Sequence, residues 1–466
     1  MKRPTKNAIA FLIGDVGSRL LGFTITAYIA RVLSPEGFGM VSIGFAALGQ
    51  LALLASPGIS LLETRNAAAA AVVPPERTGG VISLRLFLSI LICTVTWGVV
   101  RWTSGPGSAG PITLLYVTSL LPMALSLEWL FQGKERMGVV SASRIGTYLV
   151  YGIAVLFLVR GPGDVTMAAA SFLAGSWAGS LLLMFAYGSG GRIDLRWRPA
   201  LMLRIFRENL PVGAGMFLGQ LVVNLPAIIL AFFVPHGVVG SFGAAAKVVF
   251  LFLMIDRLFN SLFLPILTRH LTSGGGSPQE LFRVALKGVV ILISGLAGAG
   301  VIAAPLIIRL VFGGAYESAT PLLQIMMAYF LLTVVNSVFI CAIMAAGRTG
   351  AYLRVTAIGG GVLTVALLLG IWFFGAEGAA YGMVVGEAAS VLVALPEARK
   401  LFPFRAMPVL AAAAVSIIGL FSLPFVISTL GIWGGIGGAG ALLYASTLIV
   451  GGVSRKEFLY LKERLV

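Results

Sequence analysis

Residues 320–346 read TPLLQIMMAYFLLTVVNSVFICAIMAA, a run that contains no charged side chain. A helix needs about 20 apolar residues to cross a bilayer, so this run predicts a transmembrane helix. Hydrophobic residues make up 58 % and charged residues 11 % of the 466-residue chain, and its mean hydropathy is +1.00. Soluble globular chains carry about 25 % charged residues. The composition therefore indicates a polytopic membrane protein and excludes the soluble enzyme classes.

Similar apolar runs recur along the whole chain, and we predict an all-α fold of about 14 transmembrane helices. The runs are long and continuous, which excludes the alternating strands of a membrane β-barrel. The fourteen segments begin near residues 8, 38, 79, 111, 139, 165, 211, 237, 283, 320, 351, 378, 406 and 432.

The formal net charge of +16 is distributed unevenly over the loops. Most lysines and arginines fall in alternate loops, and the opposite loops hold only Arg31, Arg101, Arg160 and Arg309. By the positive-inside rule, both termini are expected in the cytoplasm. Basic residues in short loops meet anionic lipid headgroups, so we expect membrane lipids and no nucleic acid as partners.

The longest and most basic loop divides the chain into two parts that resemble each other. Three loop motifs recur six helices later: residues 33–39 and 233–237, 132–134 and 346–348, and 161–164 and 375–378. An even number of crossings keeps both copies in one orientation, which predicts two six-helix lobes about a pseudo-two-fold axis along the membrane normal. The predicted parts are an N-terminal lobe (1–190), a basic cytoplasmic linker (191–210), a C-terminal lobe (211–402), and two further helices with an amphipathic cytoplasmic tail (403–466).

Five basic residues fall inside predicted helices and are the candidate substrate-binding residues: Arg19, Arg85, Arg144, Lys247 and Arg257. A charge in hydrocarbon costs roughly 2.5–3.5 kcal/mol, so such side chains usually face protein or water. Arginine suits a phosphate because its guanidinium donates two parallel hydrogen bonds. Alternatives remain open: Arg85, Arg144 and Arg257 could snorkel to headgroups, and Arg19 could pair with Asp15 one turn away. Arg19 and Lys247 lie too deep to snorkel easily, and Lys247 is the strongest ligand candidate.

Asp15 and Glu387 are candidate sites for a coupling ion, H⁺ or Na⁺, although an interhelical hydrogen bond explains Glu387 equally well. We expect no other cofactor and no resident metal, because Cys93 and Cys341 lack zinc-ligand spacing and no phosphate-binding loop is present. No catalytic triad or HExxH motif occurs, so we do not expect an enzyme.

Residues 30–39 (ARVLSPEGFG) resemble the A-R-x-L-x-P-E-G-[FY]-G stretch of the polysaccharide transporters, the Wzx-type flippases. Residues 375–382 (GAEGAAYG) and 454–457 (SRKE) are also similar to that family. The superfamily includes multidrug exporters and the flippases of lipid II.

The resemblance implies that the protein moves O-antigen or exopolysaccharide repeat units, linked to undecaprenyl diphosphate, across the bacterial inner membrane by alternating access. It also implies a polymerase and glycosyltransferases of the same pathway as partners. A cationic cavity for the diphosphate is carried over to Arg19, Arg85, Arg144 and Lys247, and less firmly to Arg257.

Two other transport functions remain open, a cation-coupled multidrug exporter of the same superfamily and a lipid II flippase. A nontransporting scaffold or a membrane glycosyltransferase is a further alternative, but the longest loop is too short to hold a donor-binding domain. The small surplus of basic over acidic residues inside the helices favours an anionic substrate.

Overall fold

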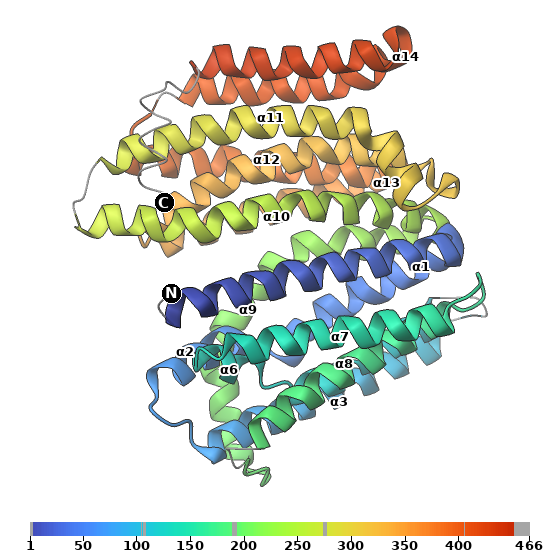
Figure 1. Cartoon of the computed structure of the whole chain (residues 1–466), viewed down its shortest axis with the longest axis vertical. Coiled ribbons are helices and arrows are strands. Elements are labelled where there is room, and N and C mark those ends of the chain that lie inside the picture. The colour runs from blue at the N-terminus through green and yellow to red at the C-terminus, as the bar shows by residue number, and fades with distance from the viewer. Residues whose placement is uncertain are drawn as a thin grey trace. The chain divides into compact units, whose positions relative to one another are not determined.

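The computed structural model describes residues 3–103, 105, 109–188, 193–273, 277–404 and 406–451, and every regular element within them is a helix (Figure 1). The predicted amphipathic tail lies outside these residues. The chain forms two compact units, Met1–Gly240 and Ser241–Val466. The helices are α1(Arg3–Ala55), α2(Ile59–Ala69), α3(Pro75–Thr103), α4(Gly110–Thr118), α5(Leu120–Leu125), α6(Glu128–Gly133), α7(Met137–Leu158), α8(Val165–Gly188), α9(Pro199–Phe233), α10(His236–Ser273), α11(Pro278–Val311), η1(Gly314–Tyr316), α12(Ala319–Ala345), α13(Thr349–Leu401) and α14(Ala406–Val450).

Nine helices in the described part of the chain are long and apolar enough to cross a membrane, and shorter apolar helices lie at 110–125 and 224–233. Three of the nine, α1, α13 and α14, contain a turn where the backbone φ is positive, at Ser34, Gly375 and Gly431. Each of these three supplies two of the predicted segments. The prediction of a polytopic all-α membrane protein with about 14 segments is therefore confirmed.

Helix α13 shows how one of these turns works. Gly375 has φ 58°, which a residue without a Cβ adopts at little cost, and the chain reverses there. A Cβ on Gly378 would overlap the carbonyl of Gly370, and a Cβ on Gly386 would overlap Leu363. In these contacts the residue numbers approach 375 from both sides, so the two halves of α13 form an antiparallel hairpin. The small residues allow its two backbones to approach closely.

In the first unit, the first half of α1 runs beside α7. Gly14 lies against Ser141, and a Cβ on Gly22 would lie 2.7 Å from the Tyr148 ring. The residue numbers rise together, so the two helices are parallel, as the predicted number of crossings between them requires.

Helix α8 packs antiparallel on α7 through small residues. A Cβ on Gly175 would lie 2.9 Å from that of Tyr151, and Ser143 Oγ donates a hydrogen bond to the carbonyl of Gly179 at 2.9 Å. This close packing fixes the face of α7 that carries its polar side chains.

The basic segment before α9 lies against the start of α3. The Asp194 amide donates to the Pro75 carbonyl at 3.3 Å, and Arg198 forms an ion pair with Glu76 at 2.6 Å. Helix α9 begins at Pro199, well before the predicted start near residue 211, and it packs on α1, α2 and α3. The helix that the sequence places first in the C-terminal lobe thus lies in the first unit.

An ion-pair cluster with a fully buried carboxylate at its centre joins α2, α3 and α9, and we name it the Glu63 cluster: Glu63, Asn66, Arg77, Glu208 and Asn209. The Glu63 side chain is 0 % exposed, and Arg77 donates to both of its oxygens, at 2.8 and 2.9 Å. Both asparagine amides also donate to Glu63, and Arg77 forms an ion pair with Glu208 at 2.9 Å. Slight burial raises the pKa of Glu208. Hydrogen bonds from Arg77 and Arg204 together lower it by a larger amount, so the pKa lies below its ordinary value.

Two motifs that echo each other in the sequence also contact each other within the first unit. A Cβ on Gly39 would overlap the His236 carbonyl, and a Cβ on Gly240 would overlap the Pro35 carbonyl. The two contacts are reciprocal, with a glycine of each turn lying on the backbone of the other. The final glycine of the ARVLSPEGFG stretch is therefore explained by a backbone-to-backbone contact.

In the second unit, α12 is the central helix, and 83 % of its most apolar stretch is buried. It packs on α11, α13 and α14. The uncharged run at residues 320–346 is therefore covered by protein on most sides.

Candidate functional site

The first unit contains a cavity of about 680 Å³. Its charged lining residues are Arg85, Glu128 and Arg144. Hydroxyl groups line much of the remainder, from Ser56, Ser60, Ser126, Ser143, Thr147, Tyr148, Ser176 and Ser180. A wall of this kind offers donors to an anion and hydrogen-bond partners to a polyol.

Arg85 is positioned by a break between α5 and α6. Ser126 has extended backbone (φ −65°, ψ 123°), which ends α5, and α6 begins two residues later at Glu128. Arg85 Nη1 donates to the carbonyl of Ser126 at 2.8 Å, and Nη2 donates to the carbonyl of Met123. Its Nε is buried and has no hydrogen-bond partner among the described residues. Two carbonyl dipoles therefore hold this guanidinium at the cavity wall.

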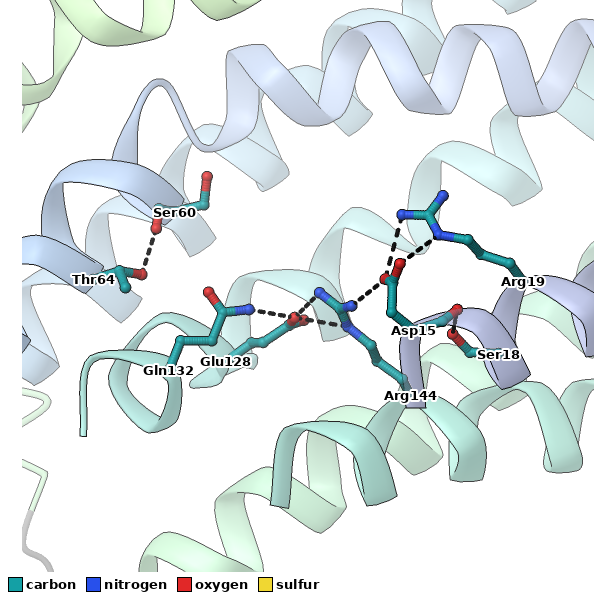
Figure 2. A network of polar contacts seen from close by, with 8 residues as sticks. All are labelled: Asp15, Ser18, Arg19, Ser60, Thr64, Glu128, Gln132 and Arg144. Carbon is teal, nitrogen blue, oxygen red and sulfur yellow. Dashed lines mark hydrogen bonds and ion pairs between the residues drawn. The ribbon is translucent and has the colours of Figure 1, made fainter. Parts of the chain in front are cut away.

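Arg144 is the centre of the cavity network, which we define as Asp15, Arg19, Glu128, Gln132 and Arg144. Figure 2 shows its guanidinium between two carboxylates. Nη1 donates to Asp15 Oδ1 at 2.6 Å, Nε donates to Glu128 Oε1 at 2.9 Å, and Nη2 donates to the same Glu128 oxygen. All three nitrogens of Arg144 thus face a carboxylate.

Each carboxylate of the network has a second partner. Arg19 Nε lies 2.8 Å from Asp15 Oδ2, so the pairing that the sequence left open for Arg19 is present in the structure. Gln132 Nε2 donates to Glu128 Oε1 at 2.8 Å (Figure 2). Glu128 stands in the first turn of α6, where the helix dipole favours a negative charge.

The side chains of the cavity network are partly exposed, and we call such ion pairs wet. The side chains of Asp15, Glu128 and Arg144 are 26 %, 32 % and 27 % exposed. Two arginines line the cavity against one carboxylate, which leaves a positive surplus at its wall. The site can therefore attract an anion, although much of the charge on Arg144 is already compensated.

The other predicted site residues lie in the second unit and do not line this cavity. Lys247 and Arg257 are on α10, where the first is half-buried and the second exposed. Their role as ligands, like that of the arginines of the first unit, stays a prediction.

Glu387 lies in a polar cluster between α12 and α13. Asn336 Nδ2 donates to Glu387 Oε1 at 2.7 Å, and the two side chains are 9 % and 8 % exposed. On the neighbouring α10, Asn260 Nδ2 donates to Ser337 Oγ at 2.6 Å. The oxygens Asn336 Oδ1 and Asp256 Oδ1 are buried without a hydrogen-bond partner among the described residues. Such acceptor oxygens are suitable ligands for Na⁺ or a proton.

Neither Glu128 nor Gln132 is among the site residues predicted from the sequence. The spacing of Glu128 and Gln132 indicates that they share one helix face. The contact of Glu128 with Arg144, by contrast, joins separate helices across sixteen residues, and no local pattern signals it.

A family model described as "Polysaccharide biosynthesis protein" matches residues 5–272, more than half of the chain and the whole cavity. The chain belongs to this family. The predicted resemblance to the polysaccharide transporters is thus confirmed.

Two curated relatives of this family member carry the provisional name O-antigen transporter. The protein from Shigella dysenteriae is 24 % identical over 52 % of this chain and 62 % of its own length. The protein from Escherichia coli (strain K12) is 24 % identical over 69 % of this chain and 78 % of its own length. The chain therefore spans less than two thirds of the first relative.

Two solved structures share the fold of this family member. The lipid II flippase MurJ, in an inward closed conformation, superposes with a TM-score of 0.70 over 94 % of this chain and 98 % of MurJ, at 14 % identity. An inward-facing multidrug resistance transporter of the MATE family superposes with a TM-score of 0.65 over 82 % of this chain and 94 % of that chain, at 15 % identity. These relatives and neighbours are named as transporters or flippases rather than enzymes, and the chain is a multi-pass membrane protein.

Proposed function

We propose that the protein is a flippase that translocates undecaprenyl-diphosphate-linked oligosaccharide repeat units across the bacterial inner membrane by alternating access. The observation that carries the proposal is the cavity with Arg85 and Arg144 in its wall. Guanidinium groups bind phosphate oxygens with paired, charge-assisted hydrogen bonds. The names of the relatives point in the same direction.

Each part of the substrate has a matching environment. The diphosphate meets Arg85 and Arg144, and the sugars meet the hydroxyl groups of the cavity wall. The prenyl chain stays in the lipid, because a long hydrocarbon chain is already in an apolar environment there and gains nothing by entering the cavity. The unpaired Nε of Arg85 is a donor that a ligand oxygen would satisfy.

Two sources of free energy could drive transport. Moving a negative charge outward is favoured when the cytoplasm is negative, by about 2.3 kcal/mol per charge and per 100 mV. We also propose that a coupling ion, H⁺ or Na⁺, binds at Asp15 or at Glu387, where Asn336 and Asp256 provide further oxygens. In a pyranine-loaded or sodium-gradient proteoliposome, Glu387→Gln should abolish the dependence of transport on one of the two gradients.

We further propose that both termini face the cytoplasm, as the distribution of basic loop residues predicts. A reporter enzyme that is active only in the periplasm should be inactive when fused to either end. The polymerase and glycosyltransferases of the pathway are the expected partners.

Complementation of a flippase-deficient strain tests the function directly. The wild type should restore surface polysaccharide, and Arg144→Ala should fail to do so while remaining in the membrane. Glu317→Gln, at an exposed residue of the second unit, is the matched control and should behave as the wild type. Complementation by Arg144→Ala and Arg85→Ala together would contradict the role of the cavity.

The competing functions predict different results. A multidrug exporter for cationic compounds needs an acidic wall, which the surplus of arginine disfavours. Drug resistance without any polysaccharide would favour the exporter. Rescue of a strain that lacks its lipid II flippase would favour that substrate.

A further inference from the structure

The guanidinium that should bind the substrate is already occupied. Each nitrogen of Arg144 donates to Asp15 or to Glu128, so an incoming anion finds a carboxylate in its place. Arg85, in contrast, is held by neutral carbonyl groups. The two arginines of the wall therefore offer different amounts of net charge.

Of the two carboxylates on Arg144, Glu128 is the one that lines the cavity. It is 32 % exposed, and its contacts with Arg144 and Gln132 pass through a single oxygen, Oε1. Asp15 is fixed more firmly, because Arg19 holds both of its oxygens. A wet carboxylate bound through one oxygen can leave its partner when a stronger anion arrives.

The charge of the ligand decides whether this exchange is favourable. A phosphodiester such as an anionic phospholipid headgroup carries one negative charge, no more than the carboxylate it must displace. A diphosphate carries at least two charges on two phosphoryl groups, and these can meet Arg85 and Arg144 at the same time.

We propose, resting on the proposed function, that Glu128 is a specificity-determining residue: it occupies Arg144 in the empty cavity so that diphosphates bind and singly charged phosphodiesters do not. The cost of displacing Glu128 is the same for both ligands, but a diphosphate offsets it with a second contact at Arg85, whereas a phosphodiester has one phosphoryl group and no second contact. This selectivity matters in a membrane, where singly charged phospholipids greatly outnumber any lipid-linked glycan.

Calorimetric titration of the purified full-length protein in detergent tests the proposal, with inorganic diphosphate and dimethyl phosphate as probes. The wild type should bind diphosphate at least about tenfold more tightly than dimethyl phosphate. In Glu128→Gln, which keeps the shape of the side chain, the affinity for dimethyl phosphate should rise about tenfold. Glu317→Gln should keep the preference of the wild type.

Glu128→Asp retracts the same charge by one methylene, and it decides the question if the glutamine variant does not fold. It should also raise the affinity for dimethyl phosphate, by a smaller factor. An unchanged affinity for dimethyl phosphate in the folded Glu128 variants, together with loss of diphosphate binding in Arg144→Ala, would overturn this role of Glu128 and leave the proposed function standing. No binding of diphosphate to the wild type would overturn both.

Discussion

The Glu63 cluster and the cavity network contain the same chemistry in opposite surroundings. In both, an arginine lies between two carboxylates, with Arg77 between Glu63 and Glu208 and Arg144 between Asp15 and Glu128. Glu63 is completely buried and its oxygens accept bonds from three side chains. Glu128 is one-third exposed and faces a cavity.

This difference teaches that exposure, rather than residue type, separates a structural ion pair from an exchangeable one. A dry pair loses several kcal/mol when one partner is removed, because the other charge is left without compensation. A wet pair loses little, because water replaces the partner. Stability and transport measurements should therefore separate the two systems.

The largest effect is expected at Glu63, the fully buried carboxylate. Glu63→Ala leaves Arg77 and Asn209 without their common acceptor, and it should destabilise the protein by about 3–5 kcal/mol. Thermal unfolding in detergent, followed by circular dichroism, measures this change. The matched variant Glu128→Ala should cost about 1 kcal/mol or less. Equal losses in the two variants would refute the contrast between dry and wet pairs.

The next effect concerns transport. Arg144→Ala should reduce diphosphate affinity by more than about tenfold, since a charge-assisted bidentate contact is lost. Its unfolding temperature should stay close to that of the wild type, because Asp15 keeps Arg19 and both carboxylates are wet. Titration calorimetry and thermal unfolding of the same preparation make the comparison. A loss of stability as large as that of Glu63→Ala would place Arg144 with the structural residues.

A smaller effect should distinguish the two arginines of the cavity wall. In Arg85→Lys a single ammonium replaces a fork that reaches the carbonyls of Met123 and Ser126, so about one hydrogen bond, roughly 1 kcal/mol, is lost. Diphosphate binding should weaken only several-fold, because the charge remains. Unchanged stability and unchanged affinity would show that the fork geometry of Arg85 has no role.

The smallest effect is a dependence on pH. The pKa of Glu208 is lowered in the folded protein, so its ion pairs stabilise the fold above the ordinary glutamate pKa of about 4.3 and are lost as pH falls through the lower folded value. The side chain is one-third exposed, so the contribution should stay below about 1 kcal/mol. Unfolding temperatures of the wild type and Glu208→Gln, measured from pH 6 to pH 3, should converge at the acid end. Parallel curves would contradict this assignment.

Much of the fold could be predicted because a membrane helix can be recognised from its own stretch of sequence. The uncharged run of α12 and the turns at Ser34 and Gly375 are all visible in the sequence as composition or as repeated motifs. The start of α9 could not be placed, because residues 199–210 are amphipathic and their contacts with α3 lie far away in the sequence.

The site was predictable only in part. The spacing of Asp15 and Arg19 is a local signal, and their pairing was one of the alternatives that the sequence left open. The partners of Arg144 come from α1 and α6, and helical spacing carries no information about such contacts. Depth in a helix identified Arg85 and Arg144 as candidates, but it could not show that one meets carbonyls and the other carboxylates.

Gly39 and Gly240 restrict how this part of the chain can vary. Gly39 rests on the carbonyl of His236, and Gly240 rests on the carbonyl of Pro35. Because backbone meets backbone at both positions, the methyl group of an alanine would act as a wedge between the two segments. Neither glycine can therefore be replaced unless the opposite segment moves away.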